Sequence, residues 1–197
     1  SNICKDCISD LAVVLDTIQD LYQVDIILSA GNYTKIPLRN WPPNEELGND
    51  DRITSPADSV RAITVGSIAN IGIDGYVEKD MPSPFSRRGP GANFLVKPDV
   101  VLSFDIYGNL VEGIGTSYSA PAVTALYAGL RNSINEENSR EFAKAFLIHS
   151  SNIPDKAKVD TQYFHRYYGY GIPKQNLEEI ITCSKSSVTL VFSGTLY

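Results

Sequence analysis

The sequence has 197 residues, of which 43% are hydrophobic and 20% charged, with a formal net charge of -6 at pH 7. A chain of this length and composition can form one compact domain with its own core. The acidic balance, with no basic stripe, argues against binding to nucleic acid or to an anionic membrane surface, since both need clustered Lys and Arg. We find no apolar run long enough to span a bilayer, so membrane contact is not expected either.

The three cysteines are Cys4, Cys7 and Cys183, an odd number without the spacing of a disulfide framework. This usage favours a reducing compartment such as the cytoplasm. The pair of Cys4 and Cys7 lacks a second ligand pair or a nearby His, so it indicates two thiols on a helix face more than a zinc site. The acidic side chains within residues 71–84 indicate a solvated segment, because a hard-cation site needs more converging oxygens. We therefore expect neither a metal nor another cofactor.

Residues 8–22 have the spacing of an amphipathic helix that packs on a neighbouring element. The apolar positions are Leu11, Val14, Leu15, Ile18, Leu21 and Tyr22. Residues 24–28 form a short apolar run typical of a buried strand. A helix followed by an apolar strand indicates a parallel α/β sheet, in which ligand sites lie beyond the carboxyl ends of the strands. Asn32 lies at such an end, although a Gly-Asn turn by itself is most often structural.

Two further apolar runs, at residues 61–68 and 97–102, predict buried strands. The polar, proline-bearing residues 33–56 predict a long surface loop, and residues 85–91 have the Gly and Pro of a turn. Residues 187–192 have the pattern of a last strand. A strand so close to the last residue suggests that the chain is part of a longer protein.

Residues 118–132 predict a helix that packs closely on the sheet. Val123, Leu126 and Leu130 share one face of it, with small residues between them. We expect Pro121 in the first turn of this helix, where a missing N–H costs little.

Ser117 lies between a glycine turn and this helix. A hydroxyl at a helix N-terminus sits in the positive field of the peptide dipoles, beside unpaired N–H groups that can hold a developing negative charge. These features suit a nucleophile, but the same position also suits an ordinary N-cap. Taken alone, the Gly-Thr-Ser sequence leaves both readings open.

Residues 142–148 predict another amphipathic helix. His149 at its end is expected to cap the helix or to be a buried polar residue. His165 lies among Tyr163, Phe164 and two further tyrosines, which indicates an aromatic loop cluster. Neither histidine is expected to be catalytic.

Five motifs follow one another along the chain: Ser29-Ala30-Gly31-Asn32, Ala62-Ile63-Thr64-Val65-Gly66, Phe85-Ser86-Arg87-Arg88-Gly89-Pro90, Lys97-Pro98-Asp99-Val100 and Gly115-Thr116-Ser117-Tyr118-Ser119-Ala120-Pro121. Together they resemble the C-terminal half of a subtilisin-like serine protease, or subtilase. The last motif is the most specific of the five.

The resemblance implies a three-layer α/β fold with a mostly parallel sheet flanked by helices, here incomplete. It makes residues 1–197 the C-terminal part of a catalytic domain whose N-terminal half, with the catalytic Asp and His, is absent. Ser117 is then the nucleophile of a serine endopeptidase acting on peptides or proteins. Asn32 supplies the side-chain donor of the oxyanion hole, beside the Ser117 N–H, and an amide suits this role because it donates without a charge. The implied pocket for the residue before the scissile bond is lined by Ser29, Ala30 and Gly31.

The sequence departs from the subtilase pattern in one respect. The catalytic Asp and His of that family precede the oxyanion Asn, whereas both histidines here follow Asn32 and no Asp-Thr-Gly, Asp-Ser-Gly or His-Gly-Thr occurs. Without a general base the Ser117 hydroxyl is a weak nucleophile, so we expect this chain alone to be inactive. Half of a parallel sheet also leaves an unpaired edge, so self-association is expected.

Two other hypotheses use the same residues. One is a non-catalytic subtilase-like module that binds peptides or proteins. The presence of both Ser117 and Asn32 favours the protease fragment, since a pseudoenzyme has no physical need of both. The other is an esterase on a different α/β scaffold, but the nucleophile motif of such esterases ends in Gly where this chain has Ser119.

Overall fold

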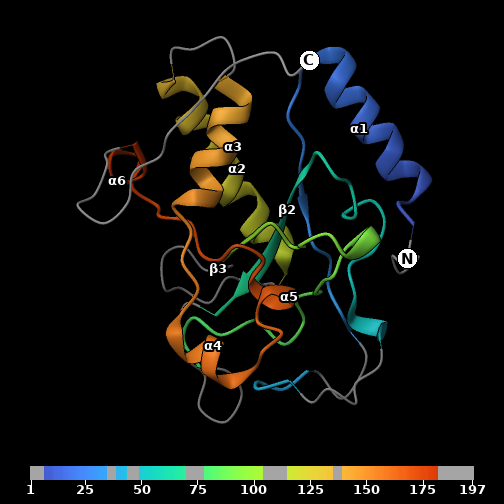
Figure 1. The fold of residues 1–197 in the computed structure, drawn as a ribbon, viewed down its shortest axis with the longest axis vertical. Helices are drawn as coiled ribbons and strands as arrows, with labels where there is room; N and C mark the ends of the chain where they lie inside the picture. Colours follow the sequence, from blue (N-terminus) through green and yellow to red (C-terminus); the bar gives the residue numbers. More distant parts are fainter. Residues whose placement is uncertain are drawn as a thin grey trace, which may run out of the picture.

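The computed structural model describes residues 7–34, 39–43, 49–69, 78–103, 115–134 and 139–181 (Figure 1). Within them, one parallel sheet is formed by β1 (Ile27–Ser29), β2 (Ile63–Ile68) and β3 (Val100–Ser103). The longer helices are α1 (Asp10–Tyr22), α2 (Thr116–Ser133) and α3 (Ser139–His149). Short helices are α4 (Asp155–Asp160), α5 (His165–Tyr168) and α6 (Leu177–Ile181), with 3-10 turns at Asn49–Asp51 and Ala92–Phe94. The strand predicted at residues 187–192 lies outside the described residues.

β2 is the centre of the sheet and is buried along its whole length. It pairs in parallel with β1, where Ile27 lies opposite Ile63, and with β3, where Val65 lies opposite Val100. Parallel strands are covered on both faces, which explains the continuous apolar runs from which these strands were predicted. Each strand begins two or three residues later than its apolar run.

Helical segments cover both faces of the sheet. α2 contacts all three strands and packs against α3, and Val100 and Val123 belong to the core between α2 and the sheet. Val101 points to the opposite face, where it packs with Tyr168 of α5. Helix, sheet and helix therefore form three layers, which confirms the predicted α/β fold class.

α1 is held in place by its polar face. Its N-cap, Ser9, donates a hydrogen bond from its hydroxyl to Asp58 (2.9 Å), and Asp16 accepts one from the Ser59 hydroxyl. The buried residues of the helix include Gln19, whereas most of the apolar stripe is exposed: Leu11, Val14, Leu21 and Tyr22. The prediction that this stripe packs on a neighbour is wrong within the described residues. Figure 1 shows α1 set apart from α2 and α3, with β1 between them in that view.

The predicted surface loop of residues 33–56 is in part a buried structure. Arg39 and Asp51 are both buried and form an ion pair (3.2 Å), and Arg88 pairs with the same carboxylate (2.8 Å). The Arg39 guanidinium also lies over the Tyr167 ring, 4.9 Å from its centre. These contacts fasten the loop to the segment around residue 88, which in turn contacts the site described below.

Pro121 is the sixth residue of α2, because the helix begins at Thr116. It therefore lies in the second turn and not in the first turn as predicted. A residue with an N–H at this position would donate to the Ser117 carbonyl, and proline has no such donor. The Ser117 carbonyl consequently receives no hydrogen bond from the N–H of residue 121.

The described parts of the chain contain neither a candidate membrane span nor a candidate metal cluster. No helix there has the length and apolar character needed to cross a bilayer. No group of three or more His, Cys, Asp or Glu in those parts could hold a metal ion. Cys7 is exposed, while Cys4 and Cys183 lie outside the described residues.

Candidate active site

The side-chain amide of Asn32, directly after β1, is held in one orientation by Thr116 at the start of α2. Its Oδ1 accepts a hydrogen bond from the Thr116 N–H (3.0 Å) and another from the Thr116 hydroxyl (3.1 Å). That hydroxyl oxygen also accepts from the N–H of Gly31 (3.2 Å). Because Oδ1 faces two donors, the Nδ2 group of the amide is turned the other way.

Gly115 separates the Asn32 amide from the Ser117 hydroxyl. A β-carbon built on Gly115 would lie 2.9 Å from Asn32 Nδ2 and 3.1 Å from Ser117 Oγ. One point in space is thus close to both a hydrogen-bond donor and a hydroxyl. Among the described residues, none accepts a bond from Asn32 Nδ2 and none pairs with Ser117 Oγ. Ser117 is exposed and lies in the first turn of α2, at the positive end of the helix dipole.

The backbone of Asn32 is held from the other side by Arg87. The Arg87 Nε donates to the Asn32 carbonyl (3.2 Å), and its Nη1 donates to the carbonyls of Asp50 and Arg52 (2.8 Å each). The Arg87 N–H also bonds to the Gly31 carbonyl (3.1 Å). Asn32 is thus fixed through its side chain by α2 and through its main chain by Arg87.

The three residues predicted to line a substrate pocket lie directly before Asn32. Ser29 ends β1 and is half-buried, and Ala30 is fully buried with its N–H bonded to the Val65 carbonyl (2.8 Å). Gly31 has a φ of +94°, and a β-carbon there would lie 2.9 Å from Arg87 Cδ. Glycine is therefore required at this position on two counts. The role of these residues in a substrate pocket stays a prediction.

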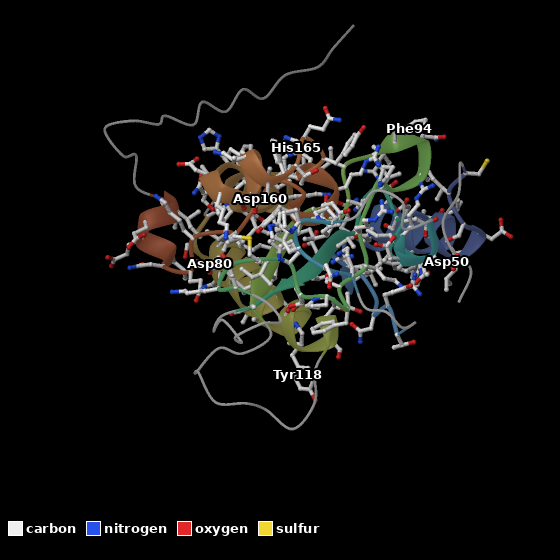
Figure 2. All side chains as sticks on the ribbon, turned by 90° about the horizontal axis from the view of Figure 1, so that it is seen from below. Asp50, Asp80, Phe94, Tyr118, Asp160 and His165 are labelled. Carbon is white, nitrogen blue, oxygen red and sulfur yellow. The ribbon has the colours of Figure 1, made fainter. Side chains whose placement is uncertain are left out.

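Neither histidine of the chain is bonded to Ser117. His149 is the exposed last residue of α3. The His165 Nδ1 lies 3.0 Å from the Gly169 carbonyl, and its ring centre is 4.2 Å from that of Phe164, in agreement with the predicted aromatic cluster. In Figure 2 His165 and Tyr118, the neighbour of Ser117, lie on opposite sides of the molecule. The described residues therefore supply no general base to the Ser117 hydroxyl.

The contacts of Thr116 and Arg87 with Asn32 were not predicted from the sequence. Thr116 stands inside the most specific motif, but its contact with Asn32 spans 84 residues. Arg87 belongs to another of the five motifs. Its role could have been suspected because Arg87 has no acidic neighbour in the sequence and stands in a turn that resembles part of a protease site.

A hydroxyl at the start of a helix thus lies near a fixed amide donor at the carboxyl end of a parallel strand, which is the arrangement that the resemblance to subtilisin-like serine proteases implies. The chain belongs to the subtilase family: the model of that family, Peptidase_S8, matches residues 20–171.

Three similar proteins illustrate the relationship. The chain is 30% identical over 201 residues to the uncharacterized protein y4bN of Sinorhizobium fredii (strain NBRC 101917 / NGR234), covering 77% of this chain and 46% of that protein. The prenylagaramide maturation protease PagA has a similar fold, with a TM-score of 0.57, 20% identity and coverage of 92% of this chain and 58% of PagA. MycP1 from the ESX-1 type VII secretion system gives a TM-score of 0.55 at 22% identity, over 84% of this chain and 44% of MycP1. The chain thus spans about half the length of these relatives.

Proposed function

We propose that this chain carries the nucleophile and the oxyanion donor of a subtilisin-like serine endopeptidase. The observation that carries the proposal is the pairing at Gly115, where Asn32 Nδ2 and Ser117 Oγ both lie about 3 Å from one point. The catalytic Asp and His would come from a segment N-terminal to this chain. The chain spans 46% and 58% of two relatives, which leaves room for such a segment, and peptides or proteins are the substrates that the family implies.

In this proposal the Ser117 hydroxyl attacks the carbonyl carbon of the scissile peptide bond. The carbonyl oxygen takes up negative charge as the tetrahedral intermediate forms, and it accepts hydrogen bonds from Asn32 Nδ2 and from the Ser117 N–H. The dipole of α2 favours the same negative charge. Thr116 keeps the amide from rotating, so the donor is in place before the substrate binds.

The proton of Ser117 has no acceptor within the described residues. A serine hydroxyl that keeps its proton attacks slowly, because the alkoxide or a partly deprotonated oxygen is the effective nucleophile. The chain expressed alone is therefore expected to be inactive, and the protein that includes the N-terminal segment is expected to be active.

A fluorophosphonate probe, which reacts with activated serines, tests this proposal. We expect it to label the full-length protein at Ser117 and to leave the 197-residue chain unlabelled. Ser117→Ala should abolish the labelling. Ser119→Ala is the matched control, because Ser119 lies on the same helix but is fully buried.

Two outcomes would contradict the proposal. If the full-length protein is folded but does not react, the chain is better explained as a non-catalytic module that binds peptides. If the 197-residue chain alone hydrolyses a peptide and Ser117→Ala abolishes this activity, the inferred need for an external base is wrong.

A further inference from the structure

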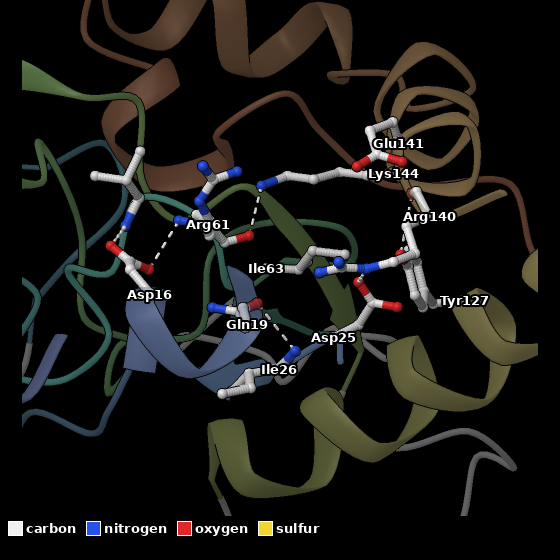
Figure 3. Close-up of a pocket in the computed structure, with 11 residues that line it drawn as sticks. Asp16, Gln19, Asp25, Ile26, Arg61, Ile63, Tyr127, Arg140, Glu141 and Lys144 are labelled. Carbon is white, nitrogen blue, oxygen red and sulfur yellow. Dashed lines mark hydrogen bonds and ion pairs between the residues drawn. The ribbon is translucent and has the colours of Figure 1, made fainter. Parts of the chain in front are cut away.

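A cavity lies at the opposite end of the sheet from Ser117 (Figure 3). Its volume is about 420 Å³, which is within the range of small-molecule sites. Ile26 and Ile63 line it where the chain enters β1 and β2, whereas Asn32 follows the other end of β1. α1, α2 and α3 supply further walls, and the segments before β1 and β2 supply the rest. The cavity is therefore separate from the candidate active site.

Two of the carboxylates that line this cavity are already occupied by partners in the protein. Asp16 accepts hydrogen bonds from the Ser59 hydroxyl and from the N–H groups of Val60 and Arg61. Asp25 pairs with the guanidinium groups of Arg131 and Arg140 (2.5 and 2.9 Å). Neither carboxylate needs a further cation.

Lys144, on α3, differs from these carboxylates because it has no ion-pair partner among the described residues. Its ammonium group donates to the main-chain carbonyl of Arg61 (2.9 Å), and no carboxylate of the described residues lies within ion-pair distance of it. An ammonium group has three donors, so two of them are left for other partners. Burial lowers the pKa of Lys144, and the neighbouring charge of Lys97 lowers it further, whereas the carboxylates of Asp99 and Asp16 raise it. An anion in the cavity would supply a counter-charge directly beside the ammonium group.

A second cation at the rim can assist. The Arg61 side chain is 56% exposed and pairs with Asp20, which is 49% exposed (2.8 Å). An exposed ion pair of this kind contributes little energy, so Arg61 can turn toward a ligand at small cost. Figure 3 shows Arg61 and Lys144 on the same side of the cavity.

The other lining residues restrict the kind of anion. Three carboxylates, Asp16, Asp25 and Glu141, border the cavity, and although the first two have partners, a dianion such as phosphate is repelled by them about twice as strongly as a monoanion. Ile26, Ile63 and the ring of Tyr127 offer apolar surface for the body of a ligand. A singly charged carboxylate with an apolar body fits both conditions.

We propose that this cavity binds a small organic monocarboxylate, with the carboxylate on the ammonium of Lys144 and the apolar body against Ile26, Ile63 and Tyr127. The site is independent of proteolysis, so its test needs no catalytic activity.

Calorimetric titration of the full-length protein with phenylacetate tests the site. We expect saturable binding of one equivalent, and at least tenfold weaker binding of the neutral isostere phenylacetamide and of inorganic phosphate. Lys144→Met should weaken phenylacetate binding at least tenfold, whereas Lys144→Arg should retain most of it. Lys158→Met is the matched control, because Lys158 pairs with Asp155 on the surface of α4.

N-acetylphenylalanine carries the same carboxylate on a peptide-like body, so its affinity relative to phenylacetate tells whether the natural ligand is a free acid or a peptide C-terminus. A second readout on the unaltered protein covers the case in which Lys144→Met fails to fold. Bound phenylacetate should protect Lys144, but not Lys158, from acetylation by an amine-reactive reagent, as quantified by mass spectrometry. Equal binding of acid and amide, or unchanged acetylation of Lys144 at saturating phenylacetate, would overturn the proposal.

Discussion

The substitution Gly115→Ala adds one methyl group at the point between the amide of Asn32 and the hydroxyl of Ser117. The new β-carbon would lie 2.9 Å from Asn32 Nδ2 and 3.1 Å from Ser117 Oγ. Unstrained contacts between such atoms are about 3.5 Å or longer, so one or both groups must move by roughly half an ångström. The φ of 173° at Gly115 is extended and suits alanine, so the effect comes from the contact and not from backbone strain.

A displacement of an ångström in an active site costs up to about a hundredfold in rate. Complete loss of a side-chain oxyanion donor costs about 2.7–4 kcal/mol in a subtilisin. For the smaller displacement here we expect the full-length protein to react with a fluorophosphonate about tenfold more slowly, or about 1.4 kcal/mol. The free energy of unfolding should change little, because Gly115 lies outside the helix interior.

The matched control for this experiment is Gly129→Ala on the same helix. A β-carbon on Gly129 would also meet an atom at 2.9 Å, but that atom is the flexible end of the Leu177 side chain. We expect labelling at the unaltered rate, with thermal unfolding reporting any change in stability. If Gly115→Ala is folded and labels as fast as the unaltered protein, the assignment of the Gly115 point to the reacting centre is refuted.

Three further predictions concern stability and association. Thr116→Val removes the hydroxyl that links Asn32 to Gly31 and should lower the free energy of unfolding by about 1–3 kcal/mol in urea, whereas Thr124→Val at an exposed position should cost much less. Burial raises the pKa of Tyr168, so above about pH 10 the tyrosine ionises in the unfolded state before it does so in the folded state, and the free energy of unfolding falls as the pH rises. In the same assay, the free energy of unfolding of the Tyr168→Phe variant should fall less steeply between about pH 8 and 10.5. The 197-residue chain should self-associate through the exposed stripe of α1 and the outer edge of β1, and light scattering that shows only monomers at high concentration would contradict this.

The sheet and its main helices could be predicted because their signals are local. β2 is buried on both faces, so its apolar run is continuous in the sequence, and the small and apolar residues of α2 recur with the helical period. α4, α5 and α6 have six, four and five residues, which is less than two helical turns, so they show no clear period. Their existence depends on packing that the sequence does not display.

Features that depend on distant partners were predicted poorly. The helical period of α1 indicates which residues share a face, but not which face contacts a neighbour. In the structure the polar face has the neighbour, because Asp16 is held by residues 59–61. Burial of Arg39 in the predicted surface loop likewise requires Asp51 and the carbonyl groups of the segment around residue 85. At the candidate site, two motifs pointed to Ser117 and Asn32, whose catalytic roles stay predictions, whereas the contact that orients the amide becomes visible only in three dimensions.

The two hydrogen bonds from Thr116 to Asn32 have a consequence for how the site moves. They join the residue that directly precedes the serine to the amide donor, so a shift of α2 against the sheet carries the hydroxyl and the donor together. Under the proposed function, docking of the segment that carries the base sets the distance from that base to Ser117, and it leaves the bonds between Thr116 and Asn32 as they are described here.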